Sequence, residues 1–97
     1  MLSSKDRAYL RGLANGIDTI FQIGKAGITP EQTERVSDAL EARELIKIRT
    51  LENCEYSSRE AAEILSERTH SEVVSVVGSR FVLYRKSKKK QRIFFVK

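Results

Sequence analysis

The chain has 97 residues, of which 40% are hydrophobic and 32% charged, and this composition is typical of one globular domain rather than a disordered or fibrous chain. Residues 1–72 hold all thirteen acidic residues beside ten lysines and arginines, whereas residues 73–97 hold eight lysines and arginines and no acid. This basic C-terminal quarter favours a partner with negative charge, which can be a nucleic acid, a membrane surface or an acidic protein.

The only cysteine, Cys54, excludes an intramolecular disulfide and a zinc site built on cysteines. The N-terminus lacks the pattern of a signal peptide, and no apolar run approaches the roughly 20 residues that a bilayer-spanning helix needs. We therefore expect a soluble, cytoplasmic protein that acts as a monomer and is not attached to a membrane.

Two helix–strand units are expected in the first half of the chain. Apolar residues at helical spacing predict a helix over residues 4–15, and a β-branched and aromatic run predicts a strand over residues 19–23. A threonine cap followed by Pro30 predicts the start of a second helix, which reaches about Ala42. Alternating apolar and charged residues at 45–50 predict a strand with one exposed face.

A third helix and an antiparallel hairpin are expected in the second half. A serine cap predicts a helix from Ser57 to about Thr69, and strands are expected over residues 72–77 and 80–85, joined by a two-residue turn. Residues 93–96 are expected to add a last edge strand. The order α-β-α-β-α-β-β predicts a single α/β domain, an open sandwich with a mixed sheet covered by helices on at least one face.

The glycine-rich sequence Gly24-Lys25-Ala26-Gly27 lies between a predicted strand and a capped helix. Backbone N–H groups at such a junction lack partners within the helix, and the helix dipole attracts anions there. Glycines permit the close approach of a phosphodiester, and the lysine adds a mobile positive charge. This pattern predicts contact with a phosphate backbone, although two glycines are also common in tight turns that bind nothing.

Other cations are further candidates for RNA contacts. Lys47 and Arg49 share one face of a predicted strand, and Arg7 and Arg11 are one turn apart on the first helix, although solvated charge explains such residues equally well or better. Tyr84 can either stack on a base or pack in the core. A basic run without acids makes up the remaining candidates: Arg85, Lys86, Lys88, Lys89, Lys90 and Arg92.

The sequence offers no equipment for catalysis. His70 and Cys54 are single residues of their types, and neither has a nucleophile or base at a suitable spacing. We therefore predict no catalytic residue, no metal site, no cofactor and no small-molecule substrate.

Three blocks of sequence resemble the CRM-domain family (chloroplast RNA splicing and ribosome maturation), and the blocks occur in the family's order. They are residues 21–29 (FQIGKAGIT), 44–48 (ELIKI) and 77–85 (VGSRFVLYR). The likeness extends over about residues 2–85 and is greatest to the bacterial single-domain, YhbY-like members. Residues 86–97 are a basic extension beyond it.

The resemblance implies a fold akin to the C-terminal domain of translation initiation factor three, with RNA bound near the glycine loop. It also implies a role on precursors of the large ribosomal subunit, where contacts to phosphates fix position without reading sequence. Two alternatives stay open: a basic module that docks on an acidic protein, and a protein that binds intron RNA.

Overall fold

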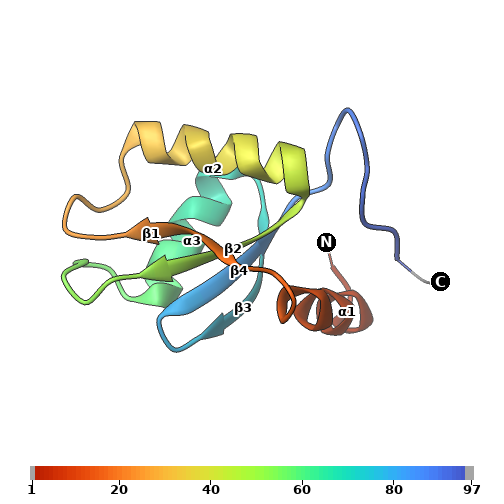
Figure 1. Ribbon diagram of the computed structural model, residues 1–97, viewed down its shortest axis with the longest axis horizontal. Coiled ribbons are helices and arrows are strands. Elements are labelled where there is room, and N and C mark those ends of the chain that lie inside the picture. Colours follow the sequence, from red (N-terminus) through yellow and green to blue (C-terminus); the bar gives the residue numbers. More distant parts are fainter. Residues whose placement is uncertain (1, 96–97) are drawn as a thin grey trace.

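The computed structural model of the protein describes residues 2–95 and contains, within that range, three helices and four strands (Figure 1). Their order is the predicted α-β-α-β-α-β-β. The elements are α1 (Ser4–Ala14), β1 (Thr19–Ile23), α2 (Pro30–Arg43), β2 (Leu45–Thr50), α3 (Ser58–Thr69), β3 (Glu72–Val77) and β4 (Arg80–Tyr84).

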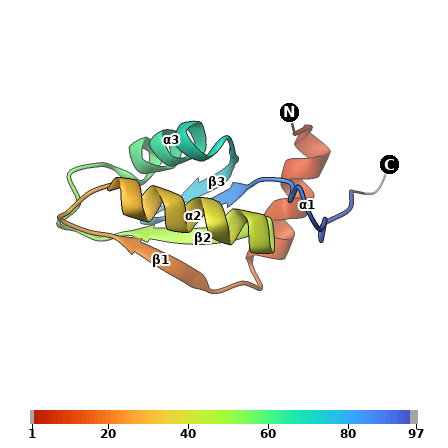
Figure 2. The ribbon, with the colours of Figure 1, turned by 90° about the horizontal axis from the view of Figure 1, so that it is seen from above.

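The four strands form one mixed sheet in the order β1-β2-β4-β3. β1 runs parallel to β2, and β4 is antiparallel to both of its neighbours. α2 and α3 lie side by side over one face, and α1 lies against part of the opposite face (Figures 1 and 2). The rest of that second face, toward the β1–α2 loop, has no helix over it, and we call it the open sheet face.

Each helix begins at a side-chain cap. Ser3 and Ser57 start α1 and α3 with capping boxes, and Thr29 accepts a hydrogen bond from the N–H of Gln32 at 3.0 Å at the start of α2. The Gln32 side chain does not complete a capping box; its Nε2 donates to the carbonyl of Gln22 at 3.0 Å and so ties α2 to β1.

Two apolar clusters fill the two faces of the sheet. The larger one, between the sheet and α2 and α3, contains the fully buried Phe81, Leu83 and Ile48. The smaller one lies under α1 and contains the buried Leu10 and Val82. Because residues from alternate strand positions enter each cluster, the sheet buries apolar side chains on both faces. The apolar cluster under α1 does not extend over the open sheet face.

The predicted helices and the first four strands are confirmed with bounds that differ by one residue at most in the strands. The expected last strand is wrong over residues 93–95, which form no ladder, while Val96 lies outside the described residues. Ile93 and Phe95 do turn inward to the cluster under α1. However, the N–H of Ile93 donates to the carboxylate of Glu44 at 2.6 Å rather than to a neighbouring strand.

Candidate nucleic-acid interface

The β1–α2 loop is a tight turn with its lysine at the tip. The N–H of Gly27 donates to the carbonyl of Gly24 at 3.0 Å, which closes the turn and leaves Lys25 and Ala26 exposed at its two central positions. The chain then enters α2 at Pro30. A backbone tip of this shape gives an anion access to main-chain N–H groups as well as to the lysine ammonium.

The local structure explains why glycine occupies both positions 24 and 27 of the loop. Gly27 has φ +72°, a left-handed conformation that strains a residue with a Cβ. A Cβ on Gly24 would lie 3.3 Å from Cδ1 of Leu51 and 3.4 Å from Oδ1 of Asn53, because the β2–α3 loop packs closely there. The loop is therefore fixed by turn geometry and by its neighbour, with only the tip free to meet a ligand.

A hollow of about 310 Å³ lies beside the loop. Its lining joins the loop backbone to the first turns of α2 and to the exposed Gln22 of β1. Lys25 and Arg35 are the cations of this hollow, and Glu31 is its carboxylate. The hollow is open to solvent and contains two cations, so it suits a backbone phosphate better than an enclosed small molecule.

The open sheet face carries cations on adjacent strands. Arg49 of β2 pairs directly with Arg80 of β4, and Gln22 of β1 pairs with Arg49 on the other side. Directly paired residues point to the same face, so both guanidinium groups project from the open sheet face, where both arginines are exposed. Like charges directly opposite each other destabilise a sheet, so an anion between them would relieve repulsion.

A groove of about 460 Å³ continues this face toward α1. It is lined by Arg11 at the end of α1, Lys47 of β2 and Arg80 of β4. The glycine loop follows the end of β1, beside the end of β2 that carries Arg49, so loop, arginine pair and groove follow one another. We call this set the loop surface: Lys25, Arg49, Arg80, Lys47 and Arg11.

The basic residues after β4 form a second region, which we call the C-terminal arm (residues 86–95 of the described chain). Figure 1 shows the arm leaving β4 at the end of the sheet far from the glycine loop. It has no regular secondary structure, yet it is held in place. Four of its lysines are exposed: Lys86, Lys88, Lys89 and Lys90.

The carboxylate of Glu44 holds the arm at two points. Glu44 lies between α2 and β2 with φ 67°, and it is fully buried. Its Oε2 accepts from the N–H of Ser87 at 2.7 Å, and its Oε1 accepts from the N–H groups of Arg92 and Ile93, the latter at 2.6 Å. A buried carboxylate needs such donors, and here the arm supplies all three of these bonds.

Glu41, one turn earlier on α2, holds the segment between those two points. It accepts from the Ser87 hydroxyl and from the N–H groups of Lys88 and Lys89 at 3.1 and 3.3 Å. The Ser87 hydroxyl first, and then the Lys88 N–H, lower the pKa of the Glu41 carboxyl to about 2. The arm backbone is thus fixed by acids while its lysine side chains face solvent.

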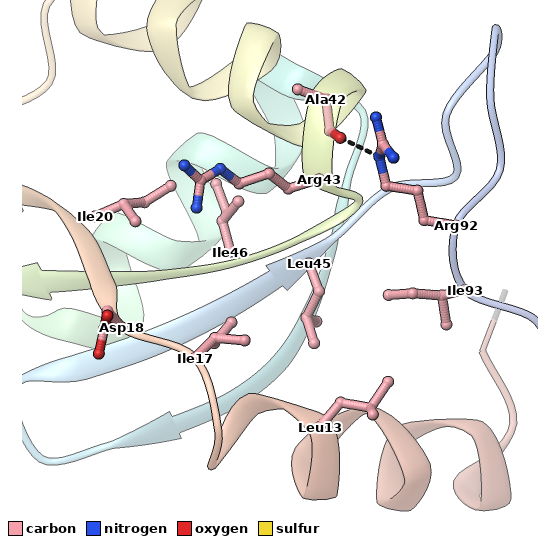
Figure 3. Close-up of a pocket in the computed structure, with 10 residues that line it drawn as sticks. All are labelled: Leu13, Ile17, Asp18, Ile20, Ala42, Arg43, Leu45, Ile46, Arg92 and Ile93. Atoms are coloured by element: carbon pink, nitrogen blue, oxygen red, sulfur yellow. Dashed lines mark hydrogen bonds between the residues drawn. The ribbon is translucent and has the colours of Figure 1, made fainter.

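Figure 3 shows the arm as one wall of an apolar pocket of about 480 Å³. Ile93 faces Leu13 of α1 and Leu45 of β2 across the pocket, and the Arg92 Nε donates to the carbonyl of Ala42. The arm is therefore part of the packed structure.

Besides Arg92, two further candidate cations donate hydrogen bonds to protein groups. The Arg85 Nη1 donates to the Ser37 hydroxyl at 2.9 Å and to the carbonyl of Thr69 at 2.8 Å. Its Nη2 donates to the carbonyl of Ser37 at 2.7 Å. Arg85 therefore joins α2 to the end of α3. Arg7 donates to the carbonyl of Val73 and joins α1 to β3. RNA contacts by these two arginines stay predictions, with a structural role beside them.

Tyr84 packs in the molecule. It is 6% exposed, and its ring meets Phe95 of the arm edge-on with centroids 5.7 Å apart. Burial, followed by the nearby carboxylates, raises the pKa of the Tyr84 hydroxyl. These contacts place the ring in the apolar cluster under α1.

Sequence reasoning missed Arg80 and the two glutamates that hold the arm. Arg80 follows a predicted hairpin turn, and its relation to Arg49 depends on the pairing of β2 with β4, which no local pattern reveals. Glu41 and Glu44 occur in a helical stretch where acids are ordinarily solvated. Their bonds to the arm span 43 to 49 residues of sequence.

Within residues 2–95 no cluster of three histidine, cysteine or acidic side chains could hold a metal ion. None of the helices in the same range is long and apolar enough to cross a membrane.

Comparisons with known proteins place this geometry among RNA-binding proteins. The model of the CRS1 / YhbY (CRM) domain matches residues 2–85. "Probable RNA-binding protein YqeI" of Bacillus subtilis is 40% identical over 93 residues, with 96% of this chain and 97% of the relative covered. A Haemophilus influenzae protein named "RNA-binding protein" is 28% identical over 86 residues, with 89% and 87% covered.

One solved structure is similar to this chain in both sequence and fold. The solution structure of the hypothetical protein SAV1595 from Staphylococcus aureus, which its description proposes as an RNA binding protein, superposes with a TM-score of 0.81. It is 49% identical in sequence, and the match covers 99% of this chain and all of that one.

Proposed function

The chain belongs to the CRS1 / YhbY (CRM) domain family, and on that premise we propose that it holds structured RNA by the phosphate backbone during assembly of the large ribosomal subunit. The family and the relatives indicate an RNA-binding protein. We propose that the protein acts by binding alone, as a cytoplasmic monomer.

The observation that carries the proposal is the continuity of the loop surface. Lys25 at the loop tip is followed on the open sheet face by the Arg49–Arg80 pair and then by the groove with Lys47 and Arg11. A strip of cations with an exposed loop tip at one end matches a phosphate backbone, which carries one charge per nucleotide.

The chemistry of the strip favours recognition of RNA shape over RNA sequence. Arginine and lysine donors bind phosphate oxygens without regard to the base, and the loop surface includes no exposed aromatic ring that would stack on one. This tolerance suits a protein that must bind folded RNA at a stage of assembly.

The helical layer formed by α2 and α3 supports this choice of surface, because its charge is mainly negative. α2 and α3 carry seven acidic and four basic residues. A polyanion is repelled from that layer and attracted to the opposite face. The acidic residues are Glu31, Glu34, Asp38, Glu41, Glu60, Glu63 and Glu67.

Support for the ribosomal client comes from the likeness to the single-domain bacterial members of the family, because the chain holds one CRM domain over residues 2–85. Intron RNA would be bound by the same surface. An acidic protein is the alternative of another class, and it would bind the basic residues without any need for the glycine loop.

The loop provides a matched test. Ala26 is exposed at the loop tip with a negative φ, so Ala26→Asp and Ala26→Asn have nearly the same shape and both spare the two glycines. Affinity for a fragment of ribosomal RNA should fall by about tenfold or more with Ala26→Asp, or roughly 1.4 kcal/mol, and change little with Ala26→Asn. Fluorescence anisotropy at two salt concentrations measures both.

Circular dichroism confirms that both variants are folded. Equal affinities of Ala26→Asp, Ala26→Asn and wild type would remove the loop from the RNA-binding surface. Binding of an acidic protein partner that is unaffected by Ala26→Asp, in the absence of RNA binding, would favour the protein-interaction module.

A further inference from the structure

The loop surface and the arm lie at opposite ends of the sheet. β1 and β2 are parallel and both end at the glycine loop, whereas the arm leaves from Tyr84, which pairs with Leu45 at the start of β2. Six residues of β2 separate the two ends, which corresponds to about 20 Å of strand. Figure 1 shows the loop and the arm at the two ends of the long axis, which measures 41 Å.

Carboxylates lie between the two cationic regions along the flanks of the sheet. On one flank an apolar pocket separates β1 from the arm, and its charged lining residues are Asp18, Arg43 and Arg92. Asp6 and Glu72 border the hollow that contains Lys86 on the other flank. The helical layer is acidic as well. A single phosphate backbone that ran from the loop surface to the arm would have to cross the apolar pocket on one flank or the acidic side chains elsewhere, which disfavours one continuous RNA track.

The arm also presents its lysines in a fixed arrangement. Glu41 and Glu44 accept hydrogen bonds from the main chain of residues 87–89 and 92–93, so the backbone that carries the lysines is docked on the end of α2. Binding to a docked segment costs less conformational entropy than binding to a free tail. The arm is thus a preformed cationic surface of its own.

We infer that the protein binds two separate RNA segments at once, one on the loop surface and one on the lysines of the C-terminal arm, and so bridges parts of a folded RNA. The inference rests on the proposed function, which it deepens by assigning a second site and a bridging role. A bridge of this kind would hold two RNA helices near each other while the surrounding structure forms.

The test uses the whole chain and a short RNA hairpin whose stem is shorter than the 41 Å long axis of the protein. Hairpins labelled with a donor and hairpins labelled with an acceptor are mixed in equal amounts and in excess over protein. Energy transfer then reports two hairpins on one protein, and sedimentation velocity gives the stoichiometry. For wild type we expect two hairpins per protein and energy transfer.

Two variants separate the sites. Changing Lys88, Lys89 and Lys90 to Gln should reduce the stoichiometry from two to one and abolish energy transfer, and Ala26→Asp should do the same through the other site. Because distant sites act independently, the remaining site should keep its affinity within about twofold. Changing the same three lysines to Arg keeps their charge, and Arg59→Gln removes one charge from α3; both controls should behave as wild type.

The outcomes are distinct. One hairpin per wild-type protein without energy transfer overturns the inference and leaves RNA binding intact. Energy transfer that persists in the triple Gln variant also overturns it, because the bridge would then come from association of protein chains. A failure of the hairpin to bind wild type even at low salt contradicts the proposed function itself.

Discussion

The loop surface and the C-terminal arm both bring cations to the surface, but they are built by different contacts. The loop is fixed by short-range geometry: a turn closed between Gly24 and Gly27, a left-handed glycine, and a capped helix directly after it. The arm is fixed by Glu41 and Glu44, more than 40 residues earlier in the chain. A surface made by local geometry can be recognised in sequence, whereas one made by distant hydrogen bonds cannot.

The first residue of β4, Arg80, and the residue directly after β4, Arg85, give the largest expected contrast. Arg85→Ala removes three hydrogen bonds to Ser37 and Thr69, and we expect it to lower the free energy of unfolding by about 2–3 kcal/mol. Arg80→Ala, at the exposed start of the strand, should change it by less than about 0.5 kcal/mol. Urea denaturation measures both.

RNA affinity should show the reverse order. Arg80→Ala should weaken binding and reduce the salt dependence, since one phosphate contact is lost, while folded Arg85→Ala should lose less affinity, because the Arg85 guanidinium already donates to Ser37 and Thr69. A loss of RNA affinity with Arg85→Ala alone would show that this guanidinium contacts RNA and that the division between structural and binding arginines is wrong.

The next largest effect is expected for the buried carboxylate that holds the arm. Glu44→Gln retains one acceptor oxygen but places an amide NH₂ against main-chain N–H groups of the arm, at a cost of about 1–2 kcal/mol. Amide hydrogen exchange of Ser87 and Ile93 should accelerate, while that of the glycine loop stays unchanged. Glu34→Gln, an exposed substitution on α2, is the control.

Unchanged protection of Ser87 and Ile93 in Glu44→Gln would show that the arm docks without the Glu44 carboxylate, through Glu41 and its apolar contacts. In that case Ile93 and Phe95, which pack in the cluster under α1, would hold the end of the arm in place of the Glu44 bonds.

A smaller effect is expected at the loop. Gly27→Ala keeps the charge of the loop but forces a Cβ into φ +72°, which costs about 1 kcal/mol. A Cβ there would lie 3.7 Å from Tyr56, an ordinary contact, so strain of the backbone is the whole expected cost. Gly12→Ala, in α1 with open space around its Cβ, should instead stabilise the protein. Equal stability of wild type and Gly27→Ala would contradict the fixed turn.

The smallest expected effect is the loss of the contacts between Glu41 and the arm at low pH. The pKa of Glu41 in the docked arm is about 2, below its ordinary value of 4.5, so its contribution is complete above pH 4.5 and is lost as the pH falls toward 2. Main-chain NMR signals of Lys88 and Lys89 should titrate with a midpoint near 2, and Glu41→Gln should abolish that transition. A midpoint near 4.5 would show that the contacts to Glu41 do not persist in solution.

The sequence predicted the helices, the strands of the sheet and the glycine loop, because each has a local cause. The caps at Thr29 and Ser57, the alternation in residues 45–50 and the turn at Gly78-Ser79 act over a few residues. The resemblance of three short blocks to the CRM-domain family was confirmed by the match over residues 2–85.

The parts that sequence did not predict depend on distant partners. The run at residues 93–96 has the composition of a strand, and Ile93 and Phe95 do alternate with the 65% exposed Phe94, but a carboxylate takes the Ile93 N–H. The roles of Arg7 and Arg85 depend on carbonyl groups 66 and 16 residues away. Long-range hydrogen bonds of this kind leave no periodic signal.

The central claim is that RNA lies on the loop surface, and an NMR titration of the ¹⁵N-labelled protein with a ribosomal RNA hairpin tests it most directly. The account predicts the largest shifts at the main-chain amides of Lys25, Ala26, Lys47, Arg49 and Arg80, with small shifts on the acidic outer side of α2 and α3. Shifts confined to the helical layer, with the loop and the open sheet face unchanged, would contradict the account.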